Sequence, residues 1–370
     1  MSRPTTYADL GVRPFINCRG TGTSVGGSIM PEPVVEAMRQ AARSFVSVET
    51  LQERIGERLA RRIGVEGALV TCGAASGVQQ AAAACLTGID AERVQRLPFT
   101  DGWRNRFVIP QVDAHDYLFQ VIAATGGVLV KVGSKESCPT AAIEAALDDD
   151  TAAVLHYLGK QTLEQLAEVV AVAEPRGIPV IVDAAAQLPP RSNLTEPVRL
   201  GAGLVVFSGG KGLRGPQSSG LVVGKAELIE AARMNGSPAS SVGRGMKVGK
   251  EELMGLLAAV ELFLDGSDQD DYRRWRADAE LIVAGLEGIE DVRATVDDGD
   301  QLFFPGGVPR VRIELLGDHT ADAYGPPLRD GEPSIFMGAW DGGMFADPMT
   351  LQPGEAQQVA RRVREVLARI

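Results

Sequence analysis

Apolar positions follow two periods along the chain, and these periods predict its elements. Residues 34–43 and 49–63 repeat apolar side chains every three or four positions, as in helices with one buried face. Gly64 follows the second segment, where a helix commonly ends. Short apolar runs instead predict strands. They lie at 68–71, 106–110, 127–132, 152–157, 179–183, 204–207 and 221–223.

Helical segments separate most of these runs. Helices are expected from about 74 to 86, near 140–147, at 163–173 and at 226–234. Because apolar strands alternate with helices, the pattern predicts an α/β fold with a mainly parallel sheet covered on both faces. Ligands in such sheets bind beyond the carboxyl ends of the strands.

The last third predicts a smaller α/β domain. Helices are expected at 251–264, 272–286 and 356–370, strands at 289–296 and 308–313, and a loop at 316–338. Asp318, His319 and Tyr324 in that loop are candidates for a substrate pocket. We expect an N-terminal arm and helix at 1–48, a large domain at 49–240 and a small domain at 241–370.

Composition narrows the class of protein. The 370 residues carry 37 Lys and Arg against 48 Asp and Glu, a net charge of −11, which counts against a large nucleic-acid surface. The four cysteines have no Cys-x-x-Cys spacing and indicate free thiols, and no metal site is predicted. No apolar run has membrane-span length and residues 1–6 do not resemble a signal peptide, so a cytoplasmic enzyme is expected.

Lys211 is the first candidate for chemistry. It lies among glycines between two apolar runs, within residues 203–224. Glycines let the backbone approach a bulky ligand, and apolar strands lower the pKa of an amine and free it as a nucleophile. A lysine that forms a Schiff base needs both conditions. The alternative is an exposed lysine in a glycine turn.

The residues at two other strand ends suit the same kind of ligand as Lys211. The strand at 179–183 ends in Asp183, and an acid there can pair with the pyridinium nitrogen of pyridoxal phosphate. The strand at 68–71 is followed by the small residues 72–77 and a helix, which suits a phosphate at the helix N-terminus. The alternative for this turn is a tight connection without a ligand.

Nucleotide-binding motifs do not fit. Gly-Lys pairs occur at 159–160, 210–211 and 249–250, but none has the earlier glycine and following Ser or Thr of a Walker A loop. The glycine-rich residues 20–27 follow no long buried strand and precede Pro31, unlike a dinucleotide fingerprint.

The motifs at 183–187 and 207–217 resemble the selenocysteine-synthase-like branch of fold type I pyridoxal phosphate (PLP) enzymes. The resemblance extends to 16–23, 70–77 and 243–250, and so to nearly the whole chain. Within that branch the chain looks more similar to the D-glucosaminate-6-phosphate ammonia-lyase group than to the tRNA-modifying synthases. The resemblance implies a mainly parallel mixed sheet sandwiched by helices, a smaller C-terminal domain, and PLP as cofactor.

It also implies roles for individual residues. Lys211 would hold the cofactor, Asp183 would keep its ring nitrogen protonated, and His115 would stack on the ring, with Asp116 and Tyr117 as alternatives to His115. The other implied cofactor contacts are Gly73, Ala74, Ala75, Gln187, Ser208 and Arg244, the last across a subunit interface. The implied substrate contacts are Asn17, Arg19, Thr21 and Arg310. Arg312 competes with Arg310, because the two are expected on opposite faces of their strand.

The favoured activity is that of a lyase. A small hydroxylated amino acid would undergo α,β-elimination and deamination through the Lys211 Schiff base, giving ammonia and a 2-keto acid. Other PLP reactions (racemisation, aldol cleavage or transamination) remain alternatives, as does selenium or sulfur transfer on seryl-tRNA. We expect a homodimer or larger homo-oligomer with active sites at subunit interfaces, and neither nucleic acid nor membrane as a partner.

Overall fold

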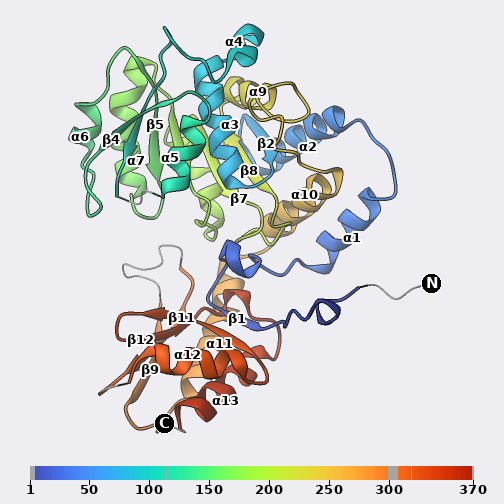
Figure 1. The fold of residues 1–370 in the computed structure, drawn as a ribbon, viewed down its shortest axis with the longest axis vertical. Coiled ribbons are helices and arrows are strands. Elements are labelled where there is room, and N and C mark those ends of the chain that lie inside the picture. Colours follow the sequence, from blue (N-terminus) through green and yellow to red (C-terminus); the bar gives the residue numbers. More distant parts are fainter. Residues whose placement is uncertain (1–4, 113–114, 299–306, 318, 369–370) are drawn as a thin grey trace. The chain divides into compact units, whose positions relative to one another are not determined.

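The computed structural model describes residues 5–112, 115–298, 307–317 and 319–368. The chain forms two compact units, one of residues Gly26–Gly266 and one that joins Met1–Val25 to Ser267–Ile370 (Figure 1). These limits differ from the expected domain boundaries. Residues 1–25 belong to the smaller unit, where strand β1 (Ile16–Cys18) pairs with β11 (Ile335–Trp340). Residues 26–48 and 241–266 belong to the larger unit, where helix α10 (Lys250–Asp265) packs on α1 (Glu32–Ala41).

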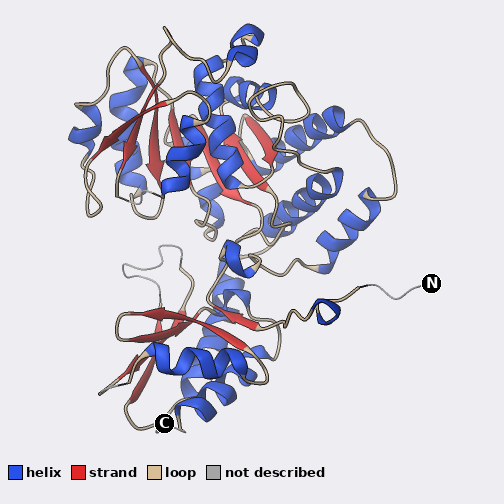
Figure 2. Cartoon of the chain, in the orientation of Figure 1, coloured by secondary structure: helices blue, strands red, loops and turns tan. Residues whose placement is uncertain are grey.

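The larger unit is built on a seven-stranded sheet (Figure 2). Its order is β2-β8-β7-β6-β5-β3-β4. Strand β8 runs antiparallel to β2 and β7, and the other neighbouring pairs are parallel. The strands are β2 Gly67–Thr71, β3 Arg106–Pro110, β4 Val128–Val132, β5 Thr151–Tyr157, β6 Val180–Asp183, β7 Leu204–Ser208 and β8 Gly220–Gly224. The other α-helices are α2 Val48–Ile63, α3 Ala74–Thr87, α4 Ala91–Arg96, α5 Asp116–Ala123, α6 Thr140–Glu144, α7 Leu163–Ala173, α8 Glu196–Arg199 and α9 Ala226–Met234. Short 3-10 helices lie at Glu174–Arg176 and Arg191–Leu194.

Each face of this sheet buries its own core. Val180 and Val182 of β6 face a core that includes side chains of α2, α7 and α10. Ile181, between them, faces a second core with side chains of α3, α5 and α9. The alternation explains why the strands have near-continuous apolar sequences. The predicted fold, a mainly parallel mixed sheet sandwiched by helices, is confirmed.

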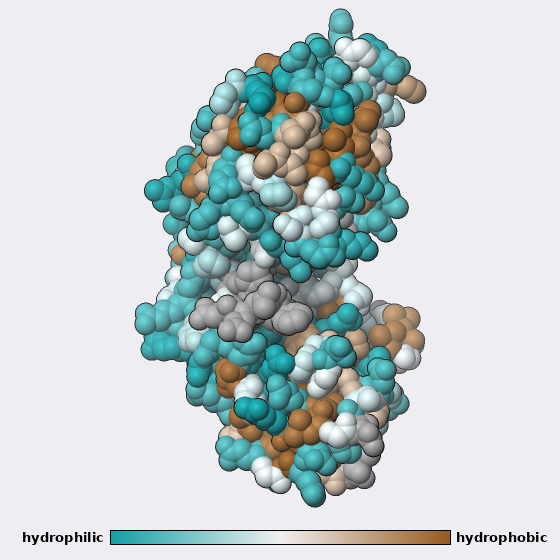
Figure 3. Space-filling view, turned by 90° about the vertical axis from the view of Figure 1, so that its left-hand side faces the viewer, coloured by the Kyte–Doolittle hydropathy of each residue, from teal (hydrophilic) through white to brown (hydrophobic). Residues whose placement is uncertain are grey.

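The strand β4 lies at one edge of the sheet and is only partly covered. Val128 is exposed, and the Lys131 ammonium lies 3.8 Å from the centre of the Phe119 ring. Figure 3 looks onto this side of the molecule, where brown apolar residues lie among teal polar ones rather than in one continuous apolar surface. A charged side chain on an edge strand is typical of protection against pairing with another chain.

The smaller unit contains a five-stranded sheet of order β1-β11-β12-β10-β9. The strands not yet bounded are β12 Gly343–Ala346, β10 Arg310–Leu315 and β9 Val292–Asp297. The helices are α11 Asp268–Gly285, α12 Ala321–Asp330 and α13 Glu355–Leu367, with 3-10 helices at Ala8–Leu10, Thr23–Val25 and Pro348–Thr350. One sheet face packs in a core with α11, α12 and α13. The other face carries the polar residues of β10.

Two expectations about this unit are wrong. Segment 316–338 is not a loop, because it contains α12 and the start of β11. Tyr324 is buried in the core and its hydroxyl hydrogen-bonds Nδ1 of His319 at 2.7 Å, whereas Asp318 lies outside the described residues. The predicted role of this segment in a substrate pocket stays a prediction. Arg310 and Arg312 do not point to opposite faces. They are two residues apart, and successive side chains alternate, so both lie on the face opposite the core.

Within the described residues, no helix is both long enough and apolar enough to span a membrane. The same residues contain no group of three or more His, Cys, Asp or Glu side chains arranged to hold a metal ion.

Candidate active site

The carboxyl ends of β6 and β7 bring Asp183 and Ser208 to one face of the larger sheet. Asp183 pairs in register with Val206, two residues before Ser208 on β7. Both side chains follow the alternation of Ile181 and Val206, which face the core beneath α3. The Asp183 carboxylate accepts a hydrogen bond from the Ala185 backbone N–H at 3.0 Å, which fixes its direction. A carboxylate and a hydroxyl therefore share the strand ends on the α3 side.

Helix α3 begins beside these residues with an open N-terminus. Gly73 precedes it at φ 119°, a conformation that favours glycine, and no side chain caps the helix. The first helical bond runs from the Gly77 N–H to the Gly73 carbonyl at 3.0 Å, so the N–H groups of Ala74 and Ala75 have no partner within the helix. Such donors and the helix dipole favour an anion.

Two glycines place this N-terminus against the sheet. A Cβ on Gly77 would come within 2.7 Å of the Val206 side chain, so only glycine lets the first turn lie this close. A Cβ on Gly220 would meet the Gly73 backbone at 2.6 Å. Because Gly220 pairs in register with Ser208, the anion-binding turn and the Ser208 hydroxyl lie at neighbouring positions.

Lys211 lies in the turn that follows β7 and is half-buried. Burial lowers the pKa of its ammonium group, and the nearby negative charge of Asp183 opposes this shift. Lys211 is thus favoured as an amine that can lose its proton more readily than an exposed lysine.

The backbone of this turn is held from several sides. The Ser28 hydroxyl lies within hydrogen-bond distance of both the Gly210 and the Lys211 carbonyls, at 2.9 and 3.0 Å. Gly212 lies directly against the Leu188 backbone, where a Cβ would clash. Nothing in the sequence marks Ser28, because a contact across 183 residues leaves no local pattern.

Gln187 and His115 occupy different surroundings. The Gln187 side chain lies against Gly159, and its backbone carbonyl accepts a hydrogen bond from the Asn193 side chain at 2.7 Å. His115 is exposed at the N-cap of α5, and its ring stacks on Tyr117 with centroids 5.7 Å apart. Their predicted contacts with a cofactor stay predictions.

The loop of Arg244 is anchored near the other end of α3. The Gly243 N–H donates to the Asn235 carbonyl at 3.1 Å, and the Asn235 side chain donates to the Thr87 hydroxyl at 2.8 Å. Thr87 is the last of the 14 residues of α3, roughly 20 Å along the helix from Gly73. Arg244 itself is exposed on this loop, and its predicted contact with a cofactor stays a prediction.

The predicted substrate residues lie in the smaller unit, where three of them are structurally linked. Arg310 forms an ion pair with the buried Asp347 at 2.7 Å, and desolvation lowers the Arg310 pKa to about 10. Gly20 lies against the same carboxylate, and its carbonyl accepts a hydrogen bond from the Asn17 side chain. The Asn17 side-chain oxygen in turn accepts from the Arg19 N–H at 2.9 Å.

Thr21, the remaining candidate, is half-buried next to this group. The Arg19 guanidinium lies 5.4 Å from the centre of the Phe336 ring. Asp347, which connects Arg310 with Gly20, was missed because nothing in its local sequence marks it. Only the pairing of β10 with β12 brings it opposite Arg310.

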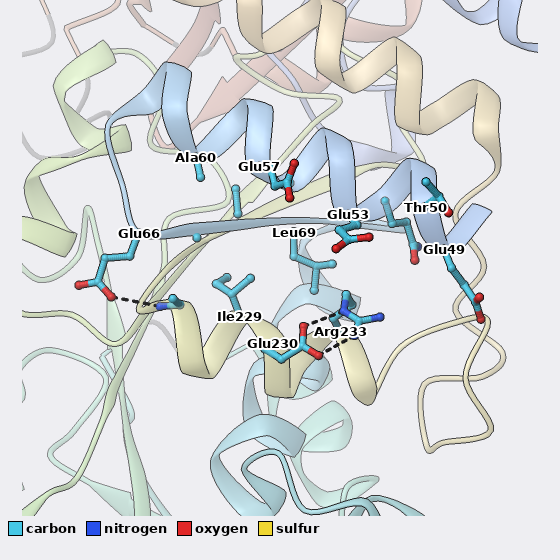
Figure 4. A pocket seen from close by; sticks show the side chains of 15 residues that line it. Glu49, Thr50, Glu53, Glu57, Ala60, Glu66, Leu69, Ile229, Glu230 and Arg233 are labelled. Atoms are coloured by element: carbon cyan, nitrogen blue, oxygen red, sulfur yellow. Dashed lines mark hydrogen bonds and ion pairs between the residues drawn. The ribbon is translucent and has the colours of Figure 1, made fainter. Parts of the chain in front are cut away.

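A separate pocket of about 650 Å³ lies between α2, β2 and α9 (Figure 4). Glu53, Glu57 and Glu230 border it, and Arg233 pairs with Glu230. Its lining contains none of the predicted site residues. We therefore place the candidate active site at the strand ends and not in this pocket.

Comparisons with known proteins agree with this architecture. The family model of L-seryl-tRNA selenium transferase matches residues 15–274. A 5'-C-glycyluridine monooxygenase-decarboxylase of a Streptomyces species is 33% identical, covering 99% of this chain and 93% of the relative. A D-glucosaminate-6-phosphate ammonia lyase of Salmonella typhimurium is 30% identical, covering 98% of each.

Solved structures give the same picture. A structure of D-glucosaminate-6-phosphate ammonia-lyase superposes with a TM-score of 0.84 at 29% identity, covering 100% of this chain and 99% of that one. A serine palmitoyltransferase from S. paucimobilis with bound PLP has a TM-score of 0.62 at 15% identity, covering 95% and 87%, which supports the fold alone. The chain therefore belongs to the L-seryl-tRNA selenium transferase family and has the architecture of fold type I PLP enzymes.

Proposed function

We propose that the protein is a PLP-dependent lyase that converts a small hydroxylated amino acid into ammonia and a 2-keto acid. The observation that carries the proposal is the placement of Asp183 at the end of β6 and of the half-buried Lys211 in the turn after the adjacent strand β7. The similarity to D-glucosaminate-6-phosphate ammonia lyase supports the lyase class.

The chemistry of the site fits PLP. PLP presents a phosphate, a carbonyl carbon and a pyridine nitrogen, which call for hydrogen-bond donors, an amine and an acid respectively. The N–H groups at the start of α3 and the Ser208 hydroxyl supply the donors. Lys211 supplies the amine and Asp183 supplies the acid. The open space beyond Gly73, where a Cβ would meet nothing within 4 Å, leaves room at the helix N-terminus.

Asp183 and Lys211 would have different roles in the reaction. Bound PLP supplies a ring that stabilises negative charge at the substrate Cα. Asp183 holds a proton at the ring nitrogen and so maintains that capacity. Lys211, with its lowered pKa, takes the proton from Cα and returns a proton to the departing β-hydroxyl. The β-hydroxyl leaves as water, and one water then replaces the amino group, so overall a β-hydroxy amino acid becomes a 2-keto acid and ammonia.

We further infer a cytoplasmic homodimer or larger homo-oligomer, with active sites at subunit interfaces. Arg244 is exposed on its loop, where it is accessible to a partner subunit, and this supports a role for Arg244 in a partner's site. The net charge of −11 favours a small amino-acid substrate over tRNA, although selenium transfer to tRNA names the family.

Product analysis tests the lyase proposal. Purified holoenzyme is incubated with both enantiomers of serine and threonine and with D-glucosaminate, and ammonia and 2-keto acid are quantified. Equal amounts of the two products are expected from at least one of them. Lys211→Ala should abolish the reaction, whereas Lys135→Ala, at an exposed position, should not. Turnover by Lys211→Ala at the unmodified rate would refute the proposal.

A second candidate is oxidative decarboxylation, favoured by the similarity to the monooxygenase-decarboxylase. The same assays separate the two activities when run in a sealed cell with an oxygen electrode. Oxygen uptake with carbon dioxide release, and no 2-keto acid, would replace the lyase assignment.

A further inference from the structure

Residues 26–29 lie along the turn that carries Lys211, and both belong to the larger unit. The Ser28 N–H donates to the Gly210 carbonyl at 3.0 Å. The Ser28 hydroxyl lies 2.9 Å from the same oxygen and 3.0 Å from the Lys211 carbonyl oxygen. A Cβ on Gly27 would clash with the Gly210 oxygen, so the two backbones are as close as glycine allows. A segment distant in sequence therefore contacts the backbone of Lys211 directly.

The turn has little conformational preference of its own. Gly209 and Gly210 precede Lys211 and Gly212 follows it. Glycine adopts many more backbone conformations than other residues, so these neighbours leave the Lys211 backbone free to rotate. The direction of the Lys211 side chain therefore depends on contacts made from outside the turn.

Ser28 supplies such a contact through two successive carbonyls. A hydroxyl has one proton to donate, and it can donate that proton to either oxygen. Both oxygens stay within its reach only while the backbone between them keeps its shape. Because backbone shape sets the direction of the Cα–Cβ bond, the hydroxyl holds the Lys211 side chain in place without contacting the amine.

Arg214 closes the turn in an uncommon conformation. Its φ is 56°, in the left-handed region, where a residue with a side chain persists only if neighbouring contacts impose it. Its N–H donates to the Lys211 carbonyl at 3.0 Å, and its Nε donates to the Ile29 carbonyl at 3.3 Å. The residue after Ser28 thus holds the far side of the same turn.

We propose that Ser28 is a positioning residue for Lys211, whose hydroxyl keeps the amine in its half-buried place at the strand ends. Its effect on turnover rests on the proposed function, but the position of the amine can be measured without cofactor or substrate. Burial lowers the pKa of the Lys211 amine. Without the hydroxyl the turn is free to move, the amine meets more water, and its pKa rises toward the ordinary value.

Trace acetylation of the full chain without cofactor, at a series of pH values, tests the proposal. Acetic anhydride reacts with the neutral amine, so the pH of half-maximal labelling, read by mass spectrometry of the Lys211 peptide, reports its protonation. In Ser28→Ala this midpoint should rise by about one pH unit, the equivalent of the roughly tenfold effect of losing one hydrogen bond. Ser28→Thr keeps a hydroxyl and should label as the unmodified protein does.

Two controls separate positioning from general loosening of the protein. Lys135 is exposed and is labelled in the same molecules, so its midpoint should not move. Ser24→Ala removes a nearby exposed hydroxyl and should leave the labelling of Lys211 unchanged. The inference would be overturned by an unchanged Lys211 midpoint in Ser28→Ala, by an equal shift at Lys135 or in Ser24→Ala, or by a Ser28→Thr protein that labels like Ser28→Ala.

Turnover by the holoenzyme gives a second measurement. Ser28→Ala should lower kcat about tenfold and leave the KM for the amino acid unchanged, because Ser28 acts on the reacting amine and not on substrate binding. Ser28→Thr should restore kcat, whereas an unchanged kcat in Ser28→Ala would count against the role. If the unmodified protein forms no 2-keto acid, the lyase proposal fails, and the labelling experiment still decides whether Ser28 positions Lys211.

Discussion

Gly77→Ala should weaken the binding of the cofactor phosphate and leave the binding of the rest of the cofactor unchanged. The added methyl would lie 2.7 Å from Val206 Cγ1 and 3.1 Å from Val222 Cγ2, both on the sheet beneath α3. Buried β-branched side chains have little rotamer freedom, so the helix must give way. To move from 2.7 Å to the 3.4 Å of an ordinary contact, its first turn must retreat by about 0.7 Å.

That retreat carries the N–H groups of Ala74 and Ala75 away from the phosphate they would bind. A hydrogen bond to a charged group contributes about 1.5–3 kcal/mol, which corresponds to about 10- to 100-fold in affinity. Gly77 has no left-handed φ, so alanine adds no backbone strain there. The loss should therefore be specific to the phosphate.

The assay is a titration of cofactor-free protein with PLP and, separately, with pyridoxal, which lacks the phosphate. Gly77→Ala should weaken PLP binding about 10- to 100-fold and leave pyridoxal binding nearly unchanged. Gly325→Ala is the control, since its methyl would meet nothing within 4 Å. An equal loss for both ligands, in a variant that unfolds at the same temperature as the unmodified protein, would refute a phosphate site at α3.

Two further predictions concern His156 and Arg244. His156 is fully buried, and burial lowers its pKa from 6.5 to about 4, so the unfolded chain takes up this proton first as the pH falls below 6.5. Between pH 7.5 and 5, the free energy of unfolding measured with urea should therefore fall by about 2 kcal/mol more for the unmodified protein than for His156→Leu. An equal fall in the two proteins would contradict this. For Arg244, we expect Arg244→Ala and Lys211→Ala to be inactive alone but to recover activity when refolded together, because a mixed assembly contains one intact site. If mass spectrometry shows mixed assemblies but no activity is recovered, a role of Arg244 across the interface would be contradicted.

The sequence predicts the larger unit well because its signals are local. Continuous apolar runs mark strands buried on both faces, and parallel strands bring their carboxyl ends to one edge. The positions of Asp183 and Lys211 at neighbouring strand ends follow directly from this.

The smaller unit is harder to predict because its organisation depends on distant pairings. Strand β1 pairs with β11 from the opposite end of the chain, and no local pattern records that contact. Helix α12 contains Pro326 and Pro327, residues that normally end a helix, so its sequence resembles a loop. A pocket of about 550 Å³ beside Arg312 is lined by residues of β9, β10, β11 and β12, so it depends on the register of four strands and could not be seen from residue types alone.

The most direct test of the central claim is to identify the residue that carries PLP. The purified protein is reduced with borohydride, digested, and its peptides are analysed by mass spectrometry. We expect the mass of the reduced cofactor on Lys211 and not in the digest of Lys211→Ala. Cofactor attached to another lysine, or no attachment after incubation with excess PLP, would contradict the assignment of the site.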